Sequence, residues 1–213
     1  MSVLRSIDEV AAEVLALPRT GRLIVGIAGS PGAGKSTIAA QLVAALPGAA
    51  LLPMDGFHLP QARLVELGRR DRMGAPDTFD VDGYVATLER LRASDSSTFG
   101  NSGVAVLAPG FDREIEEAVP DAIAITPEFP IVVTEGNYLL LGDEGWQRVA
   151  PLLDATFFVT LDRDIRLERL IARHVRFGKS PADAAAWATG PDERNAATVE
   201  ASAHKATHLI ALG

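Results

Sequence analysis

Short apolar runs alternate with segments of helical periodicity along most of the chain. Mostly apolar runs of 4 to 6 residues, too short for helices, predict strands that are buried on both faces of a sheet. They cover residues 23–28, 49–52, 104–107, 122–125, 131–134, 156–161 and 209–212. Helical patterns separate many of these runs. The sequence therefore predicts an α/β fold with a mostly parallel central sheet, in a single domain over residues 1–213.

Helix signals fill several of the intervals between these runs. Ser6, followed three residues later by Glu9, has the pattern of a capping box, and Pro18 would end that helix near Leu17. Other helical patterns cover residues 35–46, 61–67, a segment from about 81, 164–177, and a segment that opens at Ser180-Pro181. Gly178 is the expected end of the 164–177 helix.

Two stretches have no long element of their own. Residues 56–83 are rich in Arg, Asp, Gly and Pro, and loops of this length usually bind something or are disordered. Phe57, Phe79 and Tyr84 favour an ordered, functional loop. Residues 94–103, mostly Ser, Gly and Asp, predict an exposed connection.

Composition narrows the classes of partner. The chain has 20 basic and 28 acidic side chains and a net charge of -8, which argues against nucleic acid or anionic lipid as a partner. It has no cysteine, which excludes a disulfide framework, a thiolate zinc site and a thiol nucleophile. Asp8 and Glu9 interrupt any signal-peptide core, and no run approaches the about 18 apolar residues of a membrane span. We expect a cytoplasmic monomer or homodimer.

The strongest motif lies between the first predicted strand and the helix at 35–46. Residues 29–36 read Gly-Ser-Pro-Gly-Ala-Gly-Lys-Ser, which is the phosphate-loop pattern. The glycines let backbone N–H groups point inward, and the helix adds the positive end of its dipole. Lys35 would reach the β and γ phosphates, and Ser36 would bind Mg²⁺. The predicted nucleotide-binding residues are Gly29, Ser30, Gly32, Ala33, Gly34, Lys35, Ser36 and Thr37.

Two acidic residues follow predicted buried strands. Asp55 comes after residues 49–52, and Glu135 comes directly after residues 131–134. Ligands of an open parallel sheet bind beyond the carboxyl ends of its strands, so both acids are expected near the phosphates. A carboxylate there can hold Mg²⁺ or accept a proton from an attacking hydroxyl, or it can simply cap a neighbouring turn. An apolar strand that ends in an acid is typical of a Walker B element, so Glu135 joins Ser36 as a predicted metal ligand.

Four arginines recur at helical spacing in residues 164–177 and share one face of the expected helix; they are Arg166, Arg169, Arg173 and Arg176. In an acidic protein, such a cluster suits an anionic ligand or an acidic partner. One interpretation is a lid over residues 166–195 that closes on the nucleotide and places arginines against the transferring phosphoryl group. The alternative is a solvated face paired with Glu168 and Asp162.

Four segments together resemble the phosphoribulokinase and uridine kinase family of phosphate-loop kinases. They are residues 29–37, 54–58 (Met-Asp-Gly-Phe-His), 111–113 (Phe-Asp-Arg) and 134–138 (Thr-Glu-Gly-Asn-Tyr). The resemblance runs over most of the chain. It implies a three-layer P-loop NTPase fold with a helical lid, and transfer of the γ-phosphoryl group of ATP to a hydroxyl of a small metabolite. Sugars, nucleosides and pantothenate-like molecules are the acceptor classes that it suggests.

The resemblance also implies roles for individual residues. Asp55 resembles the catalytic base of the family, Glu135 its Walker-B-like acid, and Arg169 and Arg173 its lid arginines; Lys35 completes the predicted catalytic set. Asp112 has the acid position of a substrate-contacting Tyr-Asp-His motif, in which Phe111 and Arg113 replace the Tyr and His. The predicted acceptor-binding residues are Asp55, His58, Phe111, Asp112, Arg113 and Tyr138. His174 is a departure, since uridine kinases tend to have Asp there.

Some residues keep a structural interpretation beside the functional one. His58 could touch substrate or stabilise its loop, and His174, Trp146 and Trp187 are expected to pack. Asp80 and Asp82 are expected to cap the helix that begins near residue 81. Arginines 63, 69, 70 and 72 could meet an anionic acceptor or be solvated.

A different class of function stays open at this point. A phosphate loop also occurs in nucleotide-dependent switches and partner-binding ATPases that have no small-molecule acceptor. No Asn-Lys-x-Asp motif for guanine is present, so a GTPase is the weaker form of that alternative.

Overall fold

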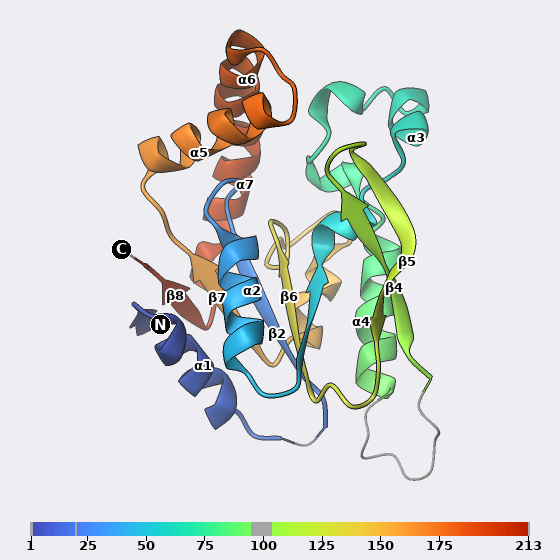
Figure 1. Ribbon diagram of the computed structural model, residues 1–213, viewed down its shortest axis with the longest axis vertical. Helices are drawn as coiled ribbons and strands as arrows, with labels where there is room; N and C mark the ends of the chain where they lie inside the picture. Colours follow the sequence, from blue (N-terminus) through green and yellow to red (C-terminus); the bar gives the residue numbers. More distant parts are fainter. Residues whose placement is uncertain (1, 20, 95–103, 213) are drawn as a thin grey trace.

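Six parallel strands form the central sheet of the protein, in the order β1-β8-β7-β2-β6-β3 (Figure 1). The computed structural model describes residues 2–19, 21–94 and 104–212. The six strands are β1 (Ser2–Leu4), β2 (Leu23–Gly29), β3 (Ala49–Pro53), β6 (Ile131–Gly136), β7 (Ala155–Val159) and β8 (His208–Ile210). β2 and β6 are buried at every residue, as expected of strands in the middle of a covered parallel sheet.

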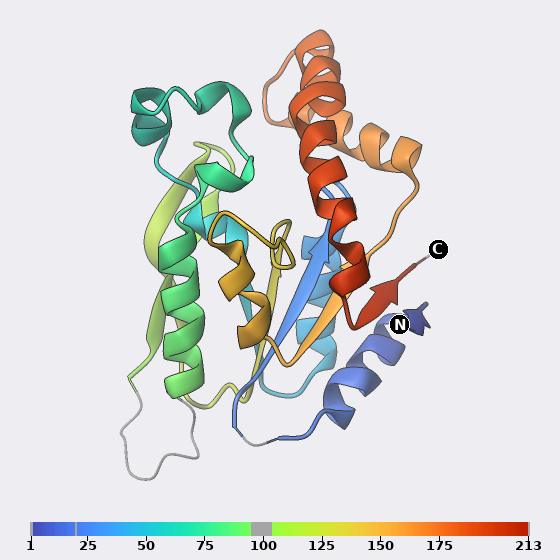
Figure 2. The same ribbon diagram turned by 180° about the vertical axis from the view of Figure 1, so that it is seen from behind.

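Helices cover both faces of the sheet and give the fold three layers. One face carries α1 (Ile7–Ala16) and α2 (Lys35–Ala45). The other face carries α4 (Val81–Ala93), α7 (Glu193–Ala201) and the short helices η4 (Trp146–Arg148) and η5 (Ala150–Leu152) (Figure 2). Alternate residues of β2 enter the two cores: Val25 and Ile27 face α1 and α2, whereas Ile24 and Ala28 face α4 and α7. The predicted α/β class is confirmed.

Two of the predicted strands lie outside the central sheet. β4 (Val106–Asp112) and β5 (Glu117–Ile125) pair with each other as an antiparallel hairpin. We predicted strands at 104–107 and 122–125 as parts of a strand–helix alternation, and this assignment was wrong for their pairing. Only residues 113–116 connect the two strands, and parallel neighbours need a crossover of about a dozen residues or more.

The N-terminal elements differ in detail from the prediction. Ser6 caps α1, and its Oγ accepts a hydrogen bond of 3.2 Å from the N–H of Glu9. The carboxylate of Glu9 accepts from the N–H of Arg5 at 2.7 Å instead of from Ser6, so the capping box is only half formed. β1 was not predicted, because three residues are too few to show a pattern.

The stretch predicted as a long functional loop is ordered by short helices. They are η1 (Met54–Phe57), α3 (Gln61–Glu66), η2 (Arg70–Arg72) and η3 (Pro76–Thr78). Asp80 caps the following helix α4, because its side chain accepts from the N–H of Gly83. Most of the predicted connection at 94–103 lies outside the described residues; Ser94 is the C-cap of α4.

The C-terminal helices stand above the carboxyl edge of the sheet (Figure 1). They are α5 (Arg163–Arg176), α6 (Pro181–Trp187) and a π-helical turn, η6 (Ala188–Asp192), that leads into α7. Gly178 ends α5 with φ 95°. Its N–H donates to the carbonyl of Val175, and the N–H of Lys179 donates to that of His174, each at 3.0 Å. This is a Schellman motif, as the position of Gly178 predicts.

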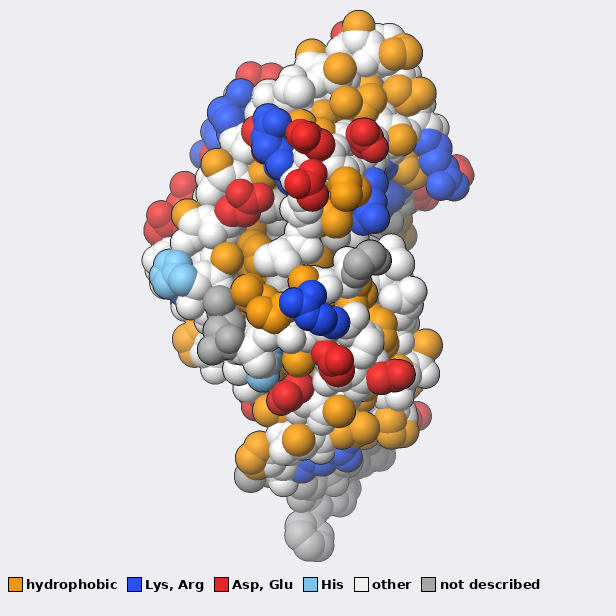
Figure 3. Space-filling model, turned by 90° about the vertical axis from the view of Figure 1, so that its left-hand side faces the viewer, with side chains coloured by type: hydrophobic (Ala, Val, Ile, Leu, Met, Phe, Trp, Pro, Cys, Tyr) orange, Lys and Arg blue, Asp and Glu red, His pale blue; other side chains and the backbone are white. Residues whose placement is uncertain are grey.

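The face of the molecule that carries both termini has side chains of mixed charge. Figure 3, which views the side on which both termini lie, shows acidic, basic and hydrophobic side chains interspersed instead of separated into regions of one sign. Over the described residues, no helix combines the length and the apolar character needed to cross a bilayer.

Candidate active site

The phosphate loop joins β2 to α2 at the carboxyl edge of the sheet. Gly34 is the N-cap of α2, with φ 95° and no side chain to bond the first turn, so the N–H groups of that turn are available to an anion. Gly32 has φ 80°, and a Cβ there would lie 2.7 Å from Leu170 Cγ of α5. Glycine is therefore required both by the turn and by the helix that packs on it.

Lys35 is the buried cation of this loop. Its ammonium group donates to the carbonyl of Ser30 at 3.0 Å, and the side chain is almost completely buried. Burial lowers the pKa of Lys35 to about 8, although the carboxylates of Glu135 and Asp55 partly offset this effect. A bound triphosphate would restore the charged form by adding negative charge next to it.

Glu135 and Ser36 form a pair of oxygen donors at the loop. Glu135 lies inside β6 instead of just beyond it, opposite Ile27 of β2 and Pro53 of β3. Ser36 Oγ donates to Glu135 Oε1 at 3.0 Å. Burial and the nearby Asp55 raise the pKa of Glu135, while Lys35 opposes this shift. The strand register thus places this carboxylate between the phosphate loop and Asp55.

Asp55 lies in η1, directly after β3. The turn passes very close to the hairpin, since a Cβ on Gly56 would lie 2.1 Å from the carbonyl oxygen of Pro109. Asp55 Oδ2 accepts a hydrogen bond of 2.6 Å from Arg113, which lies just after β4. Burial alone would raise the pKa of Asp55, but the positive charge of Arg113, followed by those of His58 and Lys35, holds it below its ordinary value. Asp55 is therefore an ionised carboxylate.

His58 extends the site away from the phosphate loop. Its Nδ1 lies 2.8 Å from the backbone carbonyl oxygen of Asp55. Its ring packs on Phe79 and Phe111, with centroid distances of 4.0 and 4.8 Å. Burial lowers the pKa of His58, with Asp55 opposing the shift. The ring, packed against two aromatic side chains, both supports the loop and lines the cavity beyond Asp55.

A cavity and an adjoining groove bring most of the predicted residues together. The cavity is lined by Lys35, Ser36, Asp55, His58, Phe111, Arg113, Glu135 and Arg173 among others. The groove runs over the phosphate loop and is lined by Gly32, Gly34, Lys35, Ser36 and Thr37, by Arg169, Arg173 and Arg176 of α5, and by Arg113 of the hairpin. The sequence prediction that these elements meet at one edge of the sheet agrees with this geometry.

Arg166 departs from the other arginines of α5. It is 2% exposed, forms an ion pair with Glu193 and donates to the carbonyl of Pro31 at 3.4 Å. It therefore supports the phosphate loop from within the structure, whereas we predicted one helix face for all four arginines and no separate, buried role for Arg166. The alternative pairing with Glu168 and Asp162 is also not observed among the described residues, since Asp162 caps α5. Burial lowers the pKa of Arg173, another arginine of α5, and the positive charge of Arg113 lowers it further.

Three predicted contact residues direct their side chains elsewhere. Asp112 Oδ1 accepts from the N–H of Glu114 at 2.8 Å and closes the hairpin turn. Ser30 Oγ donates to Glu200 of α7 at 3.0 Å. Tyr138 is buried, and its hydroxyl donates to the carbonyl of Gly74. None of the three side chains lies in the cavity wall, so a structural role for each is the better description.

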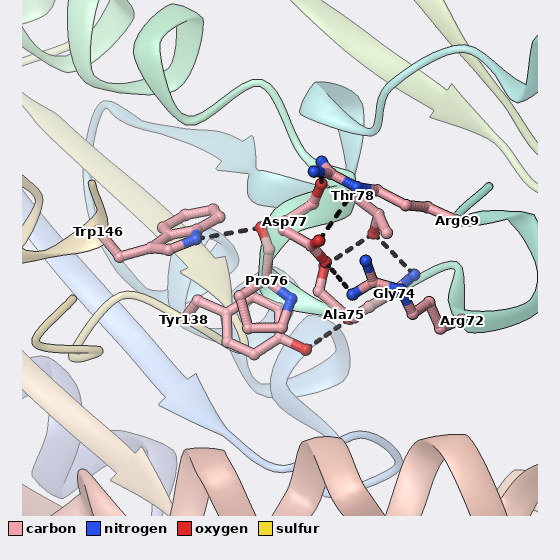
Figure 4. Close-up of polar contacts among 9 residues, drawn as sticks. All are labelled: Arg69, Arg72, Gly74, Ala75, Pro76, Asp77, Thr78, Tyr138 and Trp146. Carbon is pink, nitrogen blue, oxygen red and sulfur yellow. Dashed lines mark hydrogen bonds and ion pairs between the residues drawn. The ribbon is translucent and has the colours of Figure 1, made fainter. Parts of the chain in front are cut away.

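Tyr138 belongs to a set of contacts that fix the loop at residues 69–78 (Figure 4). Asp77 pairs with Arg69 at 3.2 Å and with Arg72 at 2.6 Å. Trp146 Nε1 donates to the carbonyl of Pro76 at 3.3 Å. Arginines 69 and 72 are therefore braces of the loop, while Arg70 lines the cavity and pairs with Glu116 at 3.2 Å. The braced loop presents Met73 and Gly74 to the cavity.

The C-terminal helices contribute cavity residues that the sequence did not reveal. Lys179 lies 4.7 Å from the ring centroid of Trp187, and His174 Nε2 lies 2.7 Å from Asp192 Oδ2. All four line the cavity, together with Asn195, Phe177 and Asn137. Trp146 is a core residue, as predicted, whereas His174 and Trp187 were predicted only to pack. The one available signal was Gly178, whose Schellman turn leads directly into Lys179.

The profile of the phosphoribulokinase / uridine kinase family matches residues 24–180, which include the phosphate loop, Asp55, Arg113, Glu135 and α5. The chain belongs to this family. It is 40% identical over 137 residues to the ATP-dependent kinase-like protein notR' of Aspergillus versicolor, covering 62% of this chain and 77% of that protein. It is 33% identical over 195 residues to the uncharacterised protein YggC of Escherichia coli, and the match covers 89% of this chain and 77% of that protein.

A solved structure gives the same fold. A protein from Silicibacter sp. TM1040, provisionally assigned as a fructose transport system kinase, superposes with a TM-score of 0.86 at 31% identity, over 97% of this chain and 99% of that one. The fold is that of the P-loop kinases. Family membership implies the use of ATP and does not identify the acceptor.

Proposed function

We propose that the protein is an ATP-dependent kinase that transfers the γ-phosphoryl group to a hydroxyl of a small metabolite. One observation carries this proposal: the ionised Asp55 lines a cavity that also contains Lys35 and Ser36 and extends beyond them to His58 and Phe79. A nucleotide-dependent switch has no need of a carboxylate that faces a lined space past the phosphates. The cavity therefore favours a kinase over the switch alternative.

The phosphates would be held by the loop and by the arginines above it. The free N–H groups of the first turn of α2 and the Lys35 ammonium would bind the β and γ phosphates. Arg169, Arg173 and Arg176 line the same groove from α5. Guanidinium groups in this position stabilise the charge that spreads over the transferring phosphoryl oxygens. We propose that residues 166–195 act as the lid that brings them close.

Ser36 and Glu135 fit a magnesium ion. Both offer hard oxygen donors, and they lie 3.0 Å apart at the loop. The described residues contain no cluster of three or more acidic, histidine or cysteine side chains that could hold a metal alone. Mg²⁺ is commonly held by one or two protein oxygens together with substrate phosphates, so a small donor set suits it. Ser36 and Glu135 would hold the ion, which would supply positive charge to offset that of the phosphates.

Asp55 would orient and deprotonate the acceptor. Its carboxylate accepts the hydroxyl proton as the acceptor oxygen bonds to the γ-phosphorus and the bond from that phosphorus to the β–γ bridging oxygen breaks. The products are the phosphorylated acceptor, ADP and a proton. A low pKa for Asp55 keeps it ionised at neutral pH, as this role requires.

The proposal is tested by incubating the protein with MgATP and a panel of nucleosides, sugars, pantothenate and glycerate, and measuring ADP release. We expect at least one acceptor to raise the rate clearly above the acceptor-free background. Asp55→Asn should lower that rate by about 10²-fold or more and still bind MgATP. ADP release that no acceptor stimulates would favour the switch, and an unchanged rate in Asp55→Asn would refute the base assignment.

A further inference from the structure

Arg113 occupies a position that no other hairpin residue shares. It lines the cavity beyond Asp55 and also the groove over the phosphate loop, where Gly34, Lys35 and Ser36 lie. Four other residues also line both spaces, but they belong to α2 or to α5 and its C-cap: Lys35, Ser36, Arg173 and Phe177. The junction of the two spaces is where a γ-phosphoryl group must pass from nucleotide to acceptor. Arg113 therefore reaches this junction from the β4-β5 hairpin, which stands on the other side of the phosphate loop from α5 (Figures 1 and 2).

The guanidinium of Arg113 has donors to spare. In the part of the chain that the structure describes, its one hydrogen bond goes to Asp55 Oδ2 at 2.6 Å. It also lies 5.8 Å from the centroid of the Phe111 ring. An arginine side chain carries five N–H donors, and the side chain of Arg113 is 41% exposed. Several of its N–H groups can thus bind a further anion without a change in the fold.

A second arginine of the same cavity shows that this arrangement is not general. Arg70 is held by two partners, Glu116 Oε2 at 3.2 Å and Gln61 Oε1 at 2.9 Å. It lines the acceptor cavity and not the phosphate-loop groove. Arg70 is anchored within the cavity wall, whereas Arg113 is tied to a single carboxylate at the point of transfer.

The backbone near Arg113 is held next to Asp55 by the packing of the hairpin. The hairpin packs on η1, with Pro109 in close contact with Gly56, so Arg113 and Asp55 are carried by two segments that are packed directly against each other. The charges of Arg113 and Arg173 also act on each other unfavourably, which contributes to the lowered pKa of Arg173. An anion between the two guanidinium groups would remove that repulsion.

We propose that Arg113 is a catalytic residue that binds the transferring γ-phosphoryl group from the hairpin side, opposite to Arg173. In the nucleotide-free protein, its pair with Asp55 holds the guanidinium in place and covers the carboxylate. When the γ-phosphate draws guanidinium N–H groups toward itself, Asp55 Oδ2 becomes free for the acceptor hydroxyl. This inference rests on the proposed function, and it adds a residue that couples triphosphate binding to the availability of the base.

The test compares binding of a nonhydrolysable ATP analogue and of ADP, both with Mg²⁺, by titration calorimetry. We expect Arg113→Gln to weaken binding of the ATP analogue by about tenfold or more, since a hydrogen bond between charged groups is lost, and to change ADP binding less than about twofold. Arg113→Lys, which keeps a point charge but not the planar fork, should give an intermediate loss. Arg63→Gln is the matched control, because Arg63 forms an exposed ion pair with Glu66 and lines neither the cavity nor the groove. It should change the affinity for neither ligand.

The outcomes separate this inference from the proposed function. If the unaltered protein binds neither nucleotide, the proposed function fails. If it binds both, and Arg113→Gln weakens both equally or neither, Arg113 does not contact the γ-phosphoryl group and the inference is overturned. Thermal unfolding of each variant checks folding, and Arg113→Lys provides the comparison if Arg113→Gln is unstable.

Discussion

The hydroxyl of Ser36 donates a 3.0 Å hydrogen bond to Glu135 Oε1, which ties the first turn of α2 to the end of β6. If this pair holds Mg²⁺, Glu135→Gln should keep the hydrogen bond and lose the charge that attracts the ion. We expect turnover to fall by about 10²-fold, and affinity for ATP to gain less from added Mg²⁺ than in the unaltered protein. Calorimetry with ATP in EDTA and in excess Mg²⁺ measures this difference. Equal Mg²⁺ enhancement in both proteins would exclude Glu135 from the metal site.

Lys35 makes nucleotide binding depend on pH. Burial lowers the pKa of Lys35 to about 8, so the ammonium is partly deprotonated in the free protein above that pH. A triphosphate favours the protonated form, and binding near pH 8 to 9 should therefore take up a proton and weaken as the pH rises. Calorimetry in buffers of different ionisation enthalpy detects the uptake. Lys35→Arg, which stays charged, should show none of it; uptake of the same size in this variant would point to another group.

The same residue affects the free energy of unfolding. The unfolded chain binds the Lys35 proton up to about its ordinary pKa of 10.5, while the folded chain releases it at about 8. Between these values the unfolded state holds more protons, so stability rises with pH relative to Lys35→Met. Urea unfolding at pH 7.5 and 9.5 should show that the free energy of unfolding of the unaltered protein, relative to that of Lys35→Met, is larger at the higher pH. A constant difference between the two proteins would contradict the lowered pKa.

Glu193 compensates a buried charge beneath the phosphate loop. Arg166 is 2% exposed, and Glu193 pairs with it and also with Arg163 at 2.6 Å. Glu193→Gln should lower the free energy of unfolding by about 3 kcal/mol, because the buried guanidinium loses its counter-charge. For a chain of this size, the Tm should fall by about 6 to 12 °C. Glu66→Gln breaks the exposed pair with Arg63 and should change stability by less than about 1 kcal/mol.

Tyr138 acts on the acceptor cavity through the loop that it anchors. Tyr138→Phe removes the donor to the carbonyl of Gly74, at a cost of about 1 kcal/mol, and frees the segment that presents Met73. We expect KM for the acceptor to rise severalfold while binding of MgATP stays the same. Tyr84→Phe is a matched control, since the Tyr84 hydroxyl is buried and bonds Thr134 at 2.6 Å without touching this loop. A similar KM change in both variants would indicate a general loss of stability.

The nucleotide half of the site could be predicted from sequence because its parts are local. The phosphate loop is one contiguous motif between a strand and a helix. Asp55 and Glu135 each follow or end an apolar run, and parallel strands bring their carboxyl ends to one edge. These rules need no knowledge of which distant side chains meet.

The remaining features depend on pairings that leave no local pattern. Arg166 has the same spacing as Arg169 and Arg173, yet it is buried because Glu193, 27 residues later, lies against it. The antiparallel pairing of β4 and β5 depends on the short turn between them. The sequence of that turn is equally compatible with an ordinary loop, so it does not reveal the pairing. Lys179 and Asn195 come from different elements of the C-terminal region, and only the packing of those helices brings them to one cavity.

In the part of the chain that the structure describes, β4 and β5 pair with each other and not with a strand of the six-stranded sheet, and the neighbouring residues 58–79 form short helices outside that sheet. Both segments can therefore vary in sequence without disturbing the register that assembles the phosphate loop. Choice of acceptor can therefore be exchanged separately from the sheet: grafting these two segments from another family member, with Arg113 retained, should change substrate preference and leave the binding of ATP intact.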